Sequence, residues 1–75
     1  MEKVVIAGGA GYLGSHLADR ICDRYDVYIV DSLVTGRLEN INHLLRLNQV
    51  RFIQDSIENI NYLNLGKVDK VFHLA

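Results

Sequence analysis

The sequence predicts an α/β fold, in which the strands of a parallel β-sheet alternate along the chain with helices. Short β-branched runs end in glycine or aspartate, and between them apolar residues recur at the spacing of a helix. Proline is absent, so glycine and clusters of Asn, Asp and Ser supply the turn signals. The chain has 75 residues, of which 49% are apolar, and this suffices for one small core and excludes a second domain.

The first predicted elements are a strand over residues 4–7 and a helix over residues 12–24. The run VVIA at 4–7 is β-branched and ends in glycines, as expected for a strand that is buried on both faces of a parallel sheet. From Leu13 to Ile21 the apolar residues recur at spacings of three and four, with charged residues between them. This pattern predicts an amphipathic helix.

Two further strands are predicted over residues 27–30 and 50–53, and each is followed by an aspartate, Asp31 and Asp55 respectively. Between them the apolar spacing predicts a second helix over residues 39–47.

A weaker helix is predicted over residues 57–63, ending near Gly66, and a fourth strand over residues 68–74. Right-handed crossovers then predict a doubly wound parallel sheet of four strands in the order 3-2-1-4, with helices on both faces. In such sheets the fourth strand is normally central. We therefore expect either a continuation of the chain or a partner beside it, and self-association through this uncovered strand is one outcome.

Composition disfavours several classes of function. Eight Lys and Arg residues balance nine Asp and Glu residues, so the basic surface that nucleic acid or an anionic membrane requires is not expected. No apolar run reaches the roughly 18 residues of a membrane span. The single cysteine, Cys22, excludes an internal disulfide and indicates a cytoplasmic protein, and the three histidines lie too far apart for a short metal-binding motif.

The most informative motif is GGAGYLG at residues 8–14, which follows the first strand and opens the first helix. Glycine permits the tight turn, Gly11 leaves room for a pyrophosphate to approach the backbone, and Gly14 lets the helix pack close to the sheet. The helix amides and dipole then favour an anion, such as the diphosphate of a dinucleotide. Taken alone, the glycines are equally compatible with a simple tight turn.

Asp31 favours the interpretation of the glycine motif as a dinucleotide site over that of a simple tight turn. It follows Gly11 by about 20 residues at the end of the second strand, where a carboxylate accepts hydrogen bonds from both hydroxyls of an adenosine ribose. By itself Asp31 would be interpreted as a residue that caps a turn. Its charge favours NAD over NADP, because it repels a 2′-phosphate, although Arg37 is a conceivable counter-charge. Asp55 is expected at the same edge of the sheet, where ligands of open α/β sheets bind.

Three segments, VIAGGAGYLGSHL at 5–17, VDSLVTGRLENI at 30–41 and VFHLA at 71–75, resemble the extended short-chain dehydrogenase/reductase family. They are most similar to its nucleotide-sugar epimerases and dehydratases. The glycines fit both the GxGxxG of ordinary dinucleotide-binding folds and the GxxGxxG of short-chain dehydrogenases. The resemblance covers essentially the whole chain and implies that residues 1–75 form the N-terminal half of an NAD-binding Rossmann domain.

The resemblance also implies which residues bind NAD. They are Gly8, Gly11, Tyr12, Leu13 and Gly14 at the pyrophosphate, Asp31 and Ser32 at the adenosine ribose, Asp55 and Ser56 at the adenine, and Leu74 and Ala75 beneath the cofactor. Ala7, Ser32 and Ser56 depart from the residues that are usual in the family. None of the three removes a charge or adds bulk at the phosphate, so altered affinity is expected and not lost binding.

Catalytic residues are not expected within this chain, because the family's Tyr-x-x-x-Lys motif is absent. The resemblance implies an enzyme that epimerises or dehydrates a nucleotide-diphosphate sugar, with its catalytic and sugar-binding residues beyond Ala75, so that residues 1–75 alone are inactive. The alternatives are a stand-alone nucleotide-binding or regulatory module and a fragment that pairs through its fourth strand. His73 is interpreted as a packed residue or a wall of the cofactor cleft, and Cys22 as a small buried hydrophobe.

Overall fold

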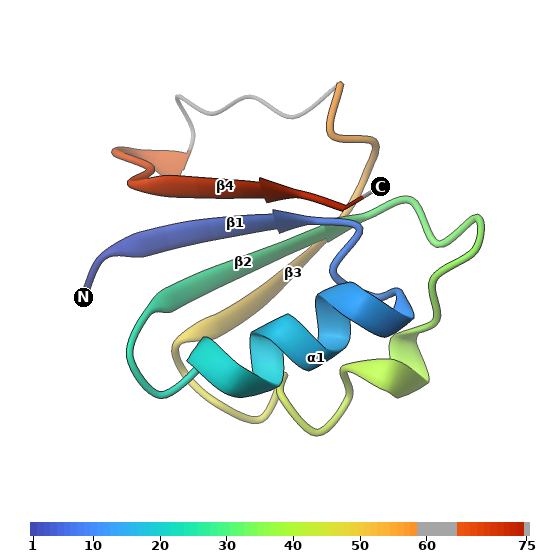
Figure 1. The fold of residues 1–75 in the computed structure, drawn as a ribbon, viewed down its shortest axis with the longest axis horizontal. Helices are drawn as coiled ribbons and strands as arrows, with labels where there is room; N and C mark the ends of the chain where they lie inside the picture. Colours follow the sequence, from blue (N-terminus) through green and yellow to red (C-terminus); the bar gives the residue numbers. More distant parts are fainter. Residues whose placement is uncertain (59–64, 75) are drawn as a thin grey trace.

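The computed structural model describes residues 1–58 and 65–74, and its strands form one parallel sheet (Figure 1). In chain order the elements are β1 (Lys3–Ala7), α1 (Tyr12–Ile21), β2 (Asp26–Asp31), the 3-10 helix η1 (Leu38–Asn40), β3 (Val50–Gln54) and β4 (Lys70–His73). The sheet has four strands in the order β3-β2-β1-β4, which confirms the predicted topology.

The register brings the carboxyl ends of the strands to one edge. Val4 of β1 pairs with Val27 of β2, which in turn pairs with Val50 of β3, while Val5 pairs with Val71 of β4. Because all pairs are parallel, the segments that follow the strands leave the sheet on the same side. This edge is where the sequence predicts the ligand.

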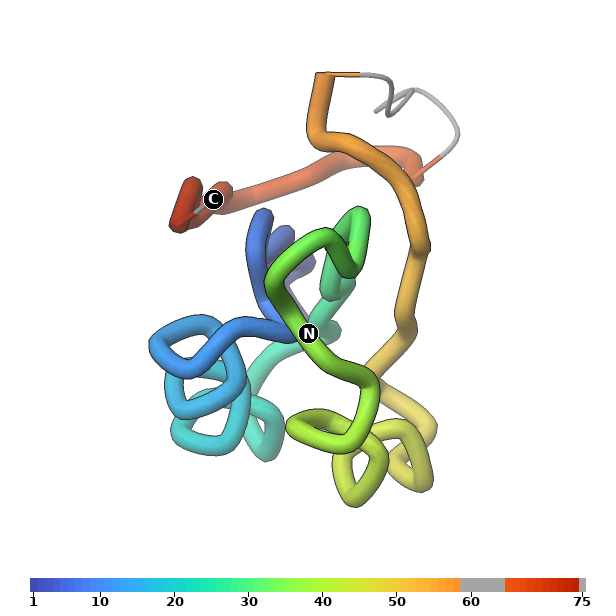
Figure 2. The backbone as a smooth tube through the Cα atoms, turned by 90° about the vertical axis from the view of Figure 1, so that its right-hand side faces the viewer, coloured from blue at the N-terminus to red at the C-terminus, as the bar shows by residue number. Residues whose placement is uncertain are grey.

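Two apolar clusters lie on the two faces of the sheet. The larger one packs under α1 and the segment after η1, and it is made of Val4, Ile6, Ala10, Ala18, Ile21, Val27, Ile29, Ile41, Leu44 and Val50. The smaller one contains Val5, Val30 and Leu65, with Tyr28, Ile53, Ile57 and Val68 packed against it. In Figure 2 α1 and the segment 38–47 lie below the strands, and residues 55–58, drawn in orange after β3, lie on the other side of the sheet. Alternate residues of each central strand thus serve opposite faces.

The predicted helix over residues 39–47 is wrong. The chain forms the short η1 and then a series of turns, in which Leu44 and Leu47 donate backbone hydrogen bonds to carbonyls three residues earlier. Asparagine favours turns over helix interiors, and three asparagines lie in this stretch or just after it. The apolar spacing is still met, because Ile41 and Leu44 are buried.

The other boundaries differ by a few residues. Helix α1 ends at Ile21 and not at residue 24, and β4 is shorter than the predicted strand over residues 68–74. Most of the predicted helix over residues 57–63 lies outside the described residues, so the described helices cover one face of the sheet. Among the described residues, no helix has the length and apolar character needed to span a bilayer.

Candidate functional site

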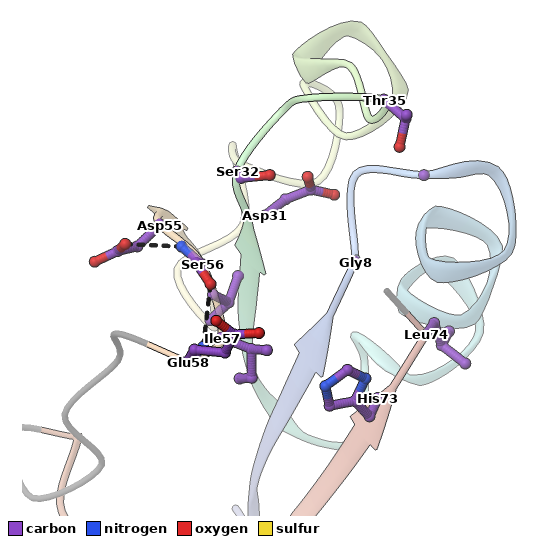
Figure 3. Close-up of a pocket in the computed structure, with 12 residues that line it drawn as sticks. Gly8, Asp31, Ser32, Thr35, Asp55, Ser56, Ile57, Glu58, His73 and Leu74 are labelled. Carbon is purple, nitrogen blue, oxygen red and sulfur yellow. Dashed lines mark hydrogen bonds between the residues drawn. The ribbon is translucent and has the colours of Figure 1, made fainter.

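A cavity of about 380 Å³ opens at the carboxyl edge of the sheet, a size within the range of small-molecule sites. It is lined by Gly8, Gly11, Val30, Asp31, Ser32, Thr35, Asp55, Ser56, Ile57, Glu58, His73 and Leu74 (Figure 3). These residues come from the ends of all four strands and from the glycine-rich turn.

The glycines of the turn serve different purposes. Gly8 has a φ of 82°, in the left-handed region that only glycine adopts readily. A methyl group on Gly9 would lie 2.5 Å from Cγ2 of Ile29, and one on Gly14 would collide with the backbone oxygen of Gly8. A methyl group on Gly11 would meet only that same oxygen, at 3.3 Å. Gly8, Gly9 and Gly14 are therefore required by the fold, whereas Gly11, where a methyl group would make one tight contact, lines the cavity.

The backbone amides of the turn divide into bonded and available groups. The amide of Gly8 donates to the carbonyl of Val30 at 2.8 Å, and that of Gly11 donates to the carbonyl of Gly8 at 3.1 Å. The first regular helical bond runs from the Ser15 amide to the Gly11 carbonyl. The amides of residues 12–14 precede that bond and are the ones that a helix N-terminus offers to an anion. The amides of Gly8 and Gly11 are thus used to hold the shape of the turn, and residues 12–14 supply the amides that are available to an anion.

Asp31 is directed at this turn (Figure 3). It is 9% exposed, and its Oδ2 accepts a hydrogen bond from the Ala10 amide at 3.0 Å while its Oδ1 accepts one from the Leu33 amide at 2.8 Å. A carboxylate accepts about four hydrogen bonds, so each oxygen retains a lone pair for a ligand hydroxyl. The Asp31 carboxylate therefore links the end of β2 to the glycine-rich turn, and it can still accept hydrogen bonds from a ligand.

The end of β3 adds two polar side chains to the cavity. The amide of Asp55 donates to the carbonyl of Asp31 at 3.2 Å, which continues the sheet pairing beyond the strand. Asp55 Oδ1 then accepts the Ser56 amide at 2.7 Å, and the Ser56 hydroxyl accepts the Glu58 amide at 3.2 Å. These local bonds turn the chain over the cavity.

The structure gathers most, but not all, of the predicted residues. Gly8, Gly11, Asp31, Ser32, Asp55, Ser56 and Leu74 line the cavity. Gly14 packs behind the turn. Tyr12 and Leu13 have exposed side chains that do not line the cavity, so their contribution would come from the backbone. Ala75 lies outside the described residues.

Besides His73, four lining residues were not predicted as site residues: Val30, Thr35, Ile57 and Glu58. Each lies within a few residues of Asp31 or Asp55, and proximity to a strand end is the one signal that would have found them. His73 lines the cavity, as the interpretation of a cleft wall requires. In the described part of the chain, no group of three or more His, Cys, Asp or Glu side chains is placed to hold a metal ion.

Cys22 lies just beyond α1, partly buried and packed against the larger apolar cluster. Burial raises the pKa of its thiol, and the charges of Asp23 and Asp19 raise it further. The thiolate is therefore disfavoured, and Cys22 acts as a packing residue.

The sequence of the chain matches a known protein family over almost its whole length. Residues 4–75 match the model of the NAD dependent epimerase/dehydratase family. The chain belongs to this family. The resemblance to nucleotide-sugar epimerases and dehydratases is thereby confirmed at the level of the family.

Individual members of the epimerase/dehydratase family are similar over almost the whole chain. UDP-glucuronic acid decarboxylase 1 of Arabidopsis thaliana is 41% identical over 75 residues, covering 97% of this chain and 16% of that protein. UDP-glucose 4-epimerase of Streptococcus mutans is 32% identical over 74 residues, covering 96% of this chain and 22% of that protein. The chain thus spans about a sixth to a fifth of the length of these relatives.

A solved member of the family has the same fold. UDP-glucuronic acid 4-epimerase from Bacillus cereus, in complex with NAD, superposes with a TM-score of 0.86 at 30% identity, covering 97% of this chain and 27% of that one.

Proposed function

We propose that this chain is the NAD-binding portion of an enzyme that epimerises or dehydrates a nucleotide-diphosphate sugar. The observation that carries the proposal is the hydrogen bond from the Ala10 amide to Asp31. It brings a carboxylate that can accept further hydrogen bonds to the glycine-rich N-terminus of α1, at the edge of one cavity. Family membership and the NAD complex of the Bacillus cereus relative support the same assignment.

The residues present fit a dinucleotide. Gly11 lines the cavity and has no side chain, so it admits a pyrophosphate close to the backbone, and the amides of residues 12–14 with the helix dipole stabilise its charge. Asp31, with Ser32 beside it, accepts the ribose hydroxyls. Asp55 and Ser56 lie farther along the same edge, where the adenine would bind, and Leu74 lies beneath.

Bound NAD would supply a hydride acceptor and donor for a carbon of the sugar. The chain's own residues bind and orient the cofactor and exclude water from its adenosine half. No tyrosine in the chain is followed four residues later by lysine, so the sequence holds no such base for the sugar hydroxyl. The residues that transfer protons and bind the sugar would lie in a continuation after Ala75.

The charge of the cavity favours NAD over NADP. A 2′-phosphate on the ribose would face Asp31 and lie near Asp55 and Glu58. Arg37, the conceivable counter-charge, pairs with Glu39 at 3.3 Å and is 74% exposed in its side chain. A phosphate would have to compete with Glu39 for it.

Titration calorimetry of the full gene product with NAD, NADP and ADP-ribose tests the proposal. We expect NAD and ADP-ribose to bind more tightly than NADP, and a nucleotide-diphosphate sugar to be turned over in the presence of NAD. Binding without turnover would instead favour a stand-alone nucleotide-binding module. Absence of NAD binding would refute the proposal.

We also propose that residues 1–75, on their own, self-associate through β4. Val71 is 48% exposed and Phe72 37% exposed on this outer strand, and unpaired strand edges with apolar side chains attract further strands. A cytoplasmic location is part of the proposal and rests on the single, free cysteine.

A further inference from the structure

The connection between β2 and β3, which contains η1, contacts the glycine-rich turn at one buried residue, Ala10. The Ala10 amide donates to Asp31 at 3.0 Å. Its carbonyl accepts two hydrogen bonds, from the backbone amide of Arg37 at 3.0 Å and from Nδ2 of Asn40 at 2.8 Å. Both polar groups of Ala10 are therefore fixed by residues that lie far away in sequence, and both lone pairs of its carbonyl are engaged.

Asn40 is the only side chain among the two donors to that carbonyl. The Arg37 donor is a backbone amide, which any residue at position 37 except proline retains. The Asn40 side chain reaches back over 30 residues of sequence and is partly buried where it does so. Substitution at position 40 therefore removes one defined hydrogen bond to the turn.

Gly36 shows how closely the connection fits. A methyl group at this position would lie 2.6 Å from Oδ2 of Asp31 and 3.0 Å from the carbonyl carbon of Ala10. The connection thus packs directly on the carboxylate and the peptide group that Asn40 also contacts.

We propose that Asn40 is a positioning residue for the dinucleotide, acting through Ala10. The Ala10 carbonyl belongs to the peptide group that leads into Gly11, the N-cap of α1, and the orientation of this peptide sets the direction of the amides that follow. Asn40 does not line the cavity, so it has no role as a ligand contact. The inference rests on the proposed function, since it assigns Asn40 to the pyrophosphate side of the same site.

Stability of the fold does not depend on the Asn40 contact alone. Ile41 and Leu44, which directly follow, are 0% and 3% exposed and anchor the connection in the larger apolar cluster. Loss of the Asn40 donor is therefore expected to loosen the turn while the connection stays in place. A carboxylate at position 40 would be worse, because it would face the Ala10 carbonyl without a donor.

The test uses Asn40→Ala and Asn40→Asp in the full gene product, with Asn42→Ala as the matched control, since Asn42 is exposed in the same connection. ADP-ribose, which carries the pyrophosphate, and adenosine, which lacks it, are the two probes. We expect Asn40→Ala to weaken ADP-ribose binding by about 3- to 10-fold and Asn40→Asp by more, the range of one net hydrogen bond. Adenosine binding and the melting temperature should match those of the control.

Two results would overturn the inference. One is that both Asn40 variants bind ADP-ribose as tightly as Asn42→Ala does. The other is that they lose adenosine and ADP-ribose binding equally, together with a lower melting temperature, which would mean a purely structural role. If the unaltered protein binds neither NAD nor ADP-ribose, the proposed function itself fails, and this outcome is recognised without any variant.

Discussion

Asp31 at the end of β2 and Ala10 in the glycine-rich turn are joined by a buried hydrogen bond of 3.0 Å, from the backbone amide of Ala10 to the carboxylate. This bond spans 21 residues of sequence and connects the strand end and the glycine-rich turn, the two features on which the proposed dinucleotide site rests. Since a buried amide must find a partner, the carboxylate is needed by the fold as well as by the proposed ligand. Asp31 therefore has two roles, one in holding the turn and one in the proposed binding of the ligand.

Asp31→Asn is expected to weaken NAD binding by about 10- to 100-fold, the range for loss of a hydrogen bond to a charged group. It should also reduce the preference for NAD over NADP, because the repelling charge is removed. Calorimetry with both cofactors measures these effects. Asp23→Asn is the control, since Asp23 is exposed and pairs only weakly with Arg24 at 3.7 Å. Equal affinities for NAD in the two variants would contradict the assignment of Asp31.

Gly11→Ala and Gly14→Ala are expected to separate binding from folding. A methyl group at position 14 meets the backbone of Gly8, which cannot move aside, so Gly14→Ala should destabilise the protein by about 1–3 kcal/mol. A methyl group at position 11 meets only the backbone oxygen of Gly8, at 3.3 Å, which is a milder contact than at position 14, so Gly11→Ala should lower the stability less than Gly14→Ala while weakening NAD binding. Urea unfolding and calorimetry on the same samples check the pair. Unchanged NAD affinity in Gly11→Ala would show that the pyrophosphate does not approach this position.

Asp69 is expected to contribute to stability in a pH-dependent manner. Its Oδ2 accepts the Lys3 amide at 2.8 Å, and this bond, assisted by the charges of Lys67 and Lys70, lowers the pKa of the carboxyl below its ordinary value of 3.8. The unfolded chain then binds the proton first, so stability falls as the pH drops from 3.8 through the folded pKa and is fully present above 3.8.

The measurement for Asp69 is the free energy of unfolding as a function of pH. In Asp69→Asn the acid limb of this curve should be flatter, and the stability at neutral pH lower, than in the unaltered protein. Asp23→Asn again serves as the control, because Asp23 is exposed and accepts no backbone amide among the hydrogen bonds of the described residues. An identical acid limb in Asp69→Asn would rule out the contribution of this bond.

Val71→Lys is expected to reduce self-association of residues 1–75. Val71 lies on β4, half exposed, and a lysine on an edge strand opposes pairing with another chain. Sedimentation equilibrium over a range of concentrations should show a mass that rises with concentration in the unaltered chain and less so in the variant. A monomer at every concentration of the unaltered chain would remove the basis for this prediction.

The fold could be predicted from sequence where one signal dominates. The strands are β-branched runs with abrupt ends, such as the run that ends at Asp31, and their order follows from the handedness of parallel connections. The stretch 39–47 failed because apolar spacing does not distinguish a helix from successive turns when the same residues, Ile41 and Leu44, are buried in both cases.

The site could be predicted where a residue ends a strand, as Asp31 does, or directly follows one, as Asp55 does. Thr35 and Glu58 could not be predicted because the shape of a turn, and not a repeating sequence pattern, brings them to the cavity. The hydrogen bond between Asn40 and Ala10 could not be predicted either, since a single contact between residues 30 positions apart has no signature in the local sequence.

The left-handed conformation of Gly8 and the crowding at Gly9 and Gly14 constrain how such a chain can change. At these positions a side chain would strain or crowd the backbone of the turn itself, whether or not a nucleotide is bound. A lineage that abandons the chemistry but keeps the architecture would therefore still carry these three glycines.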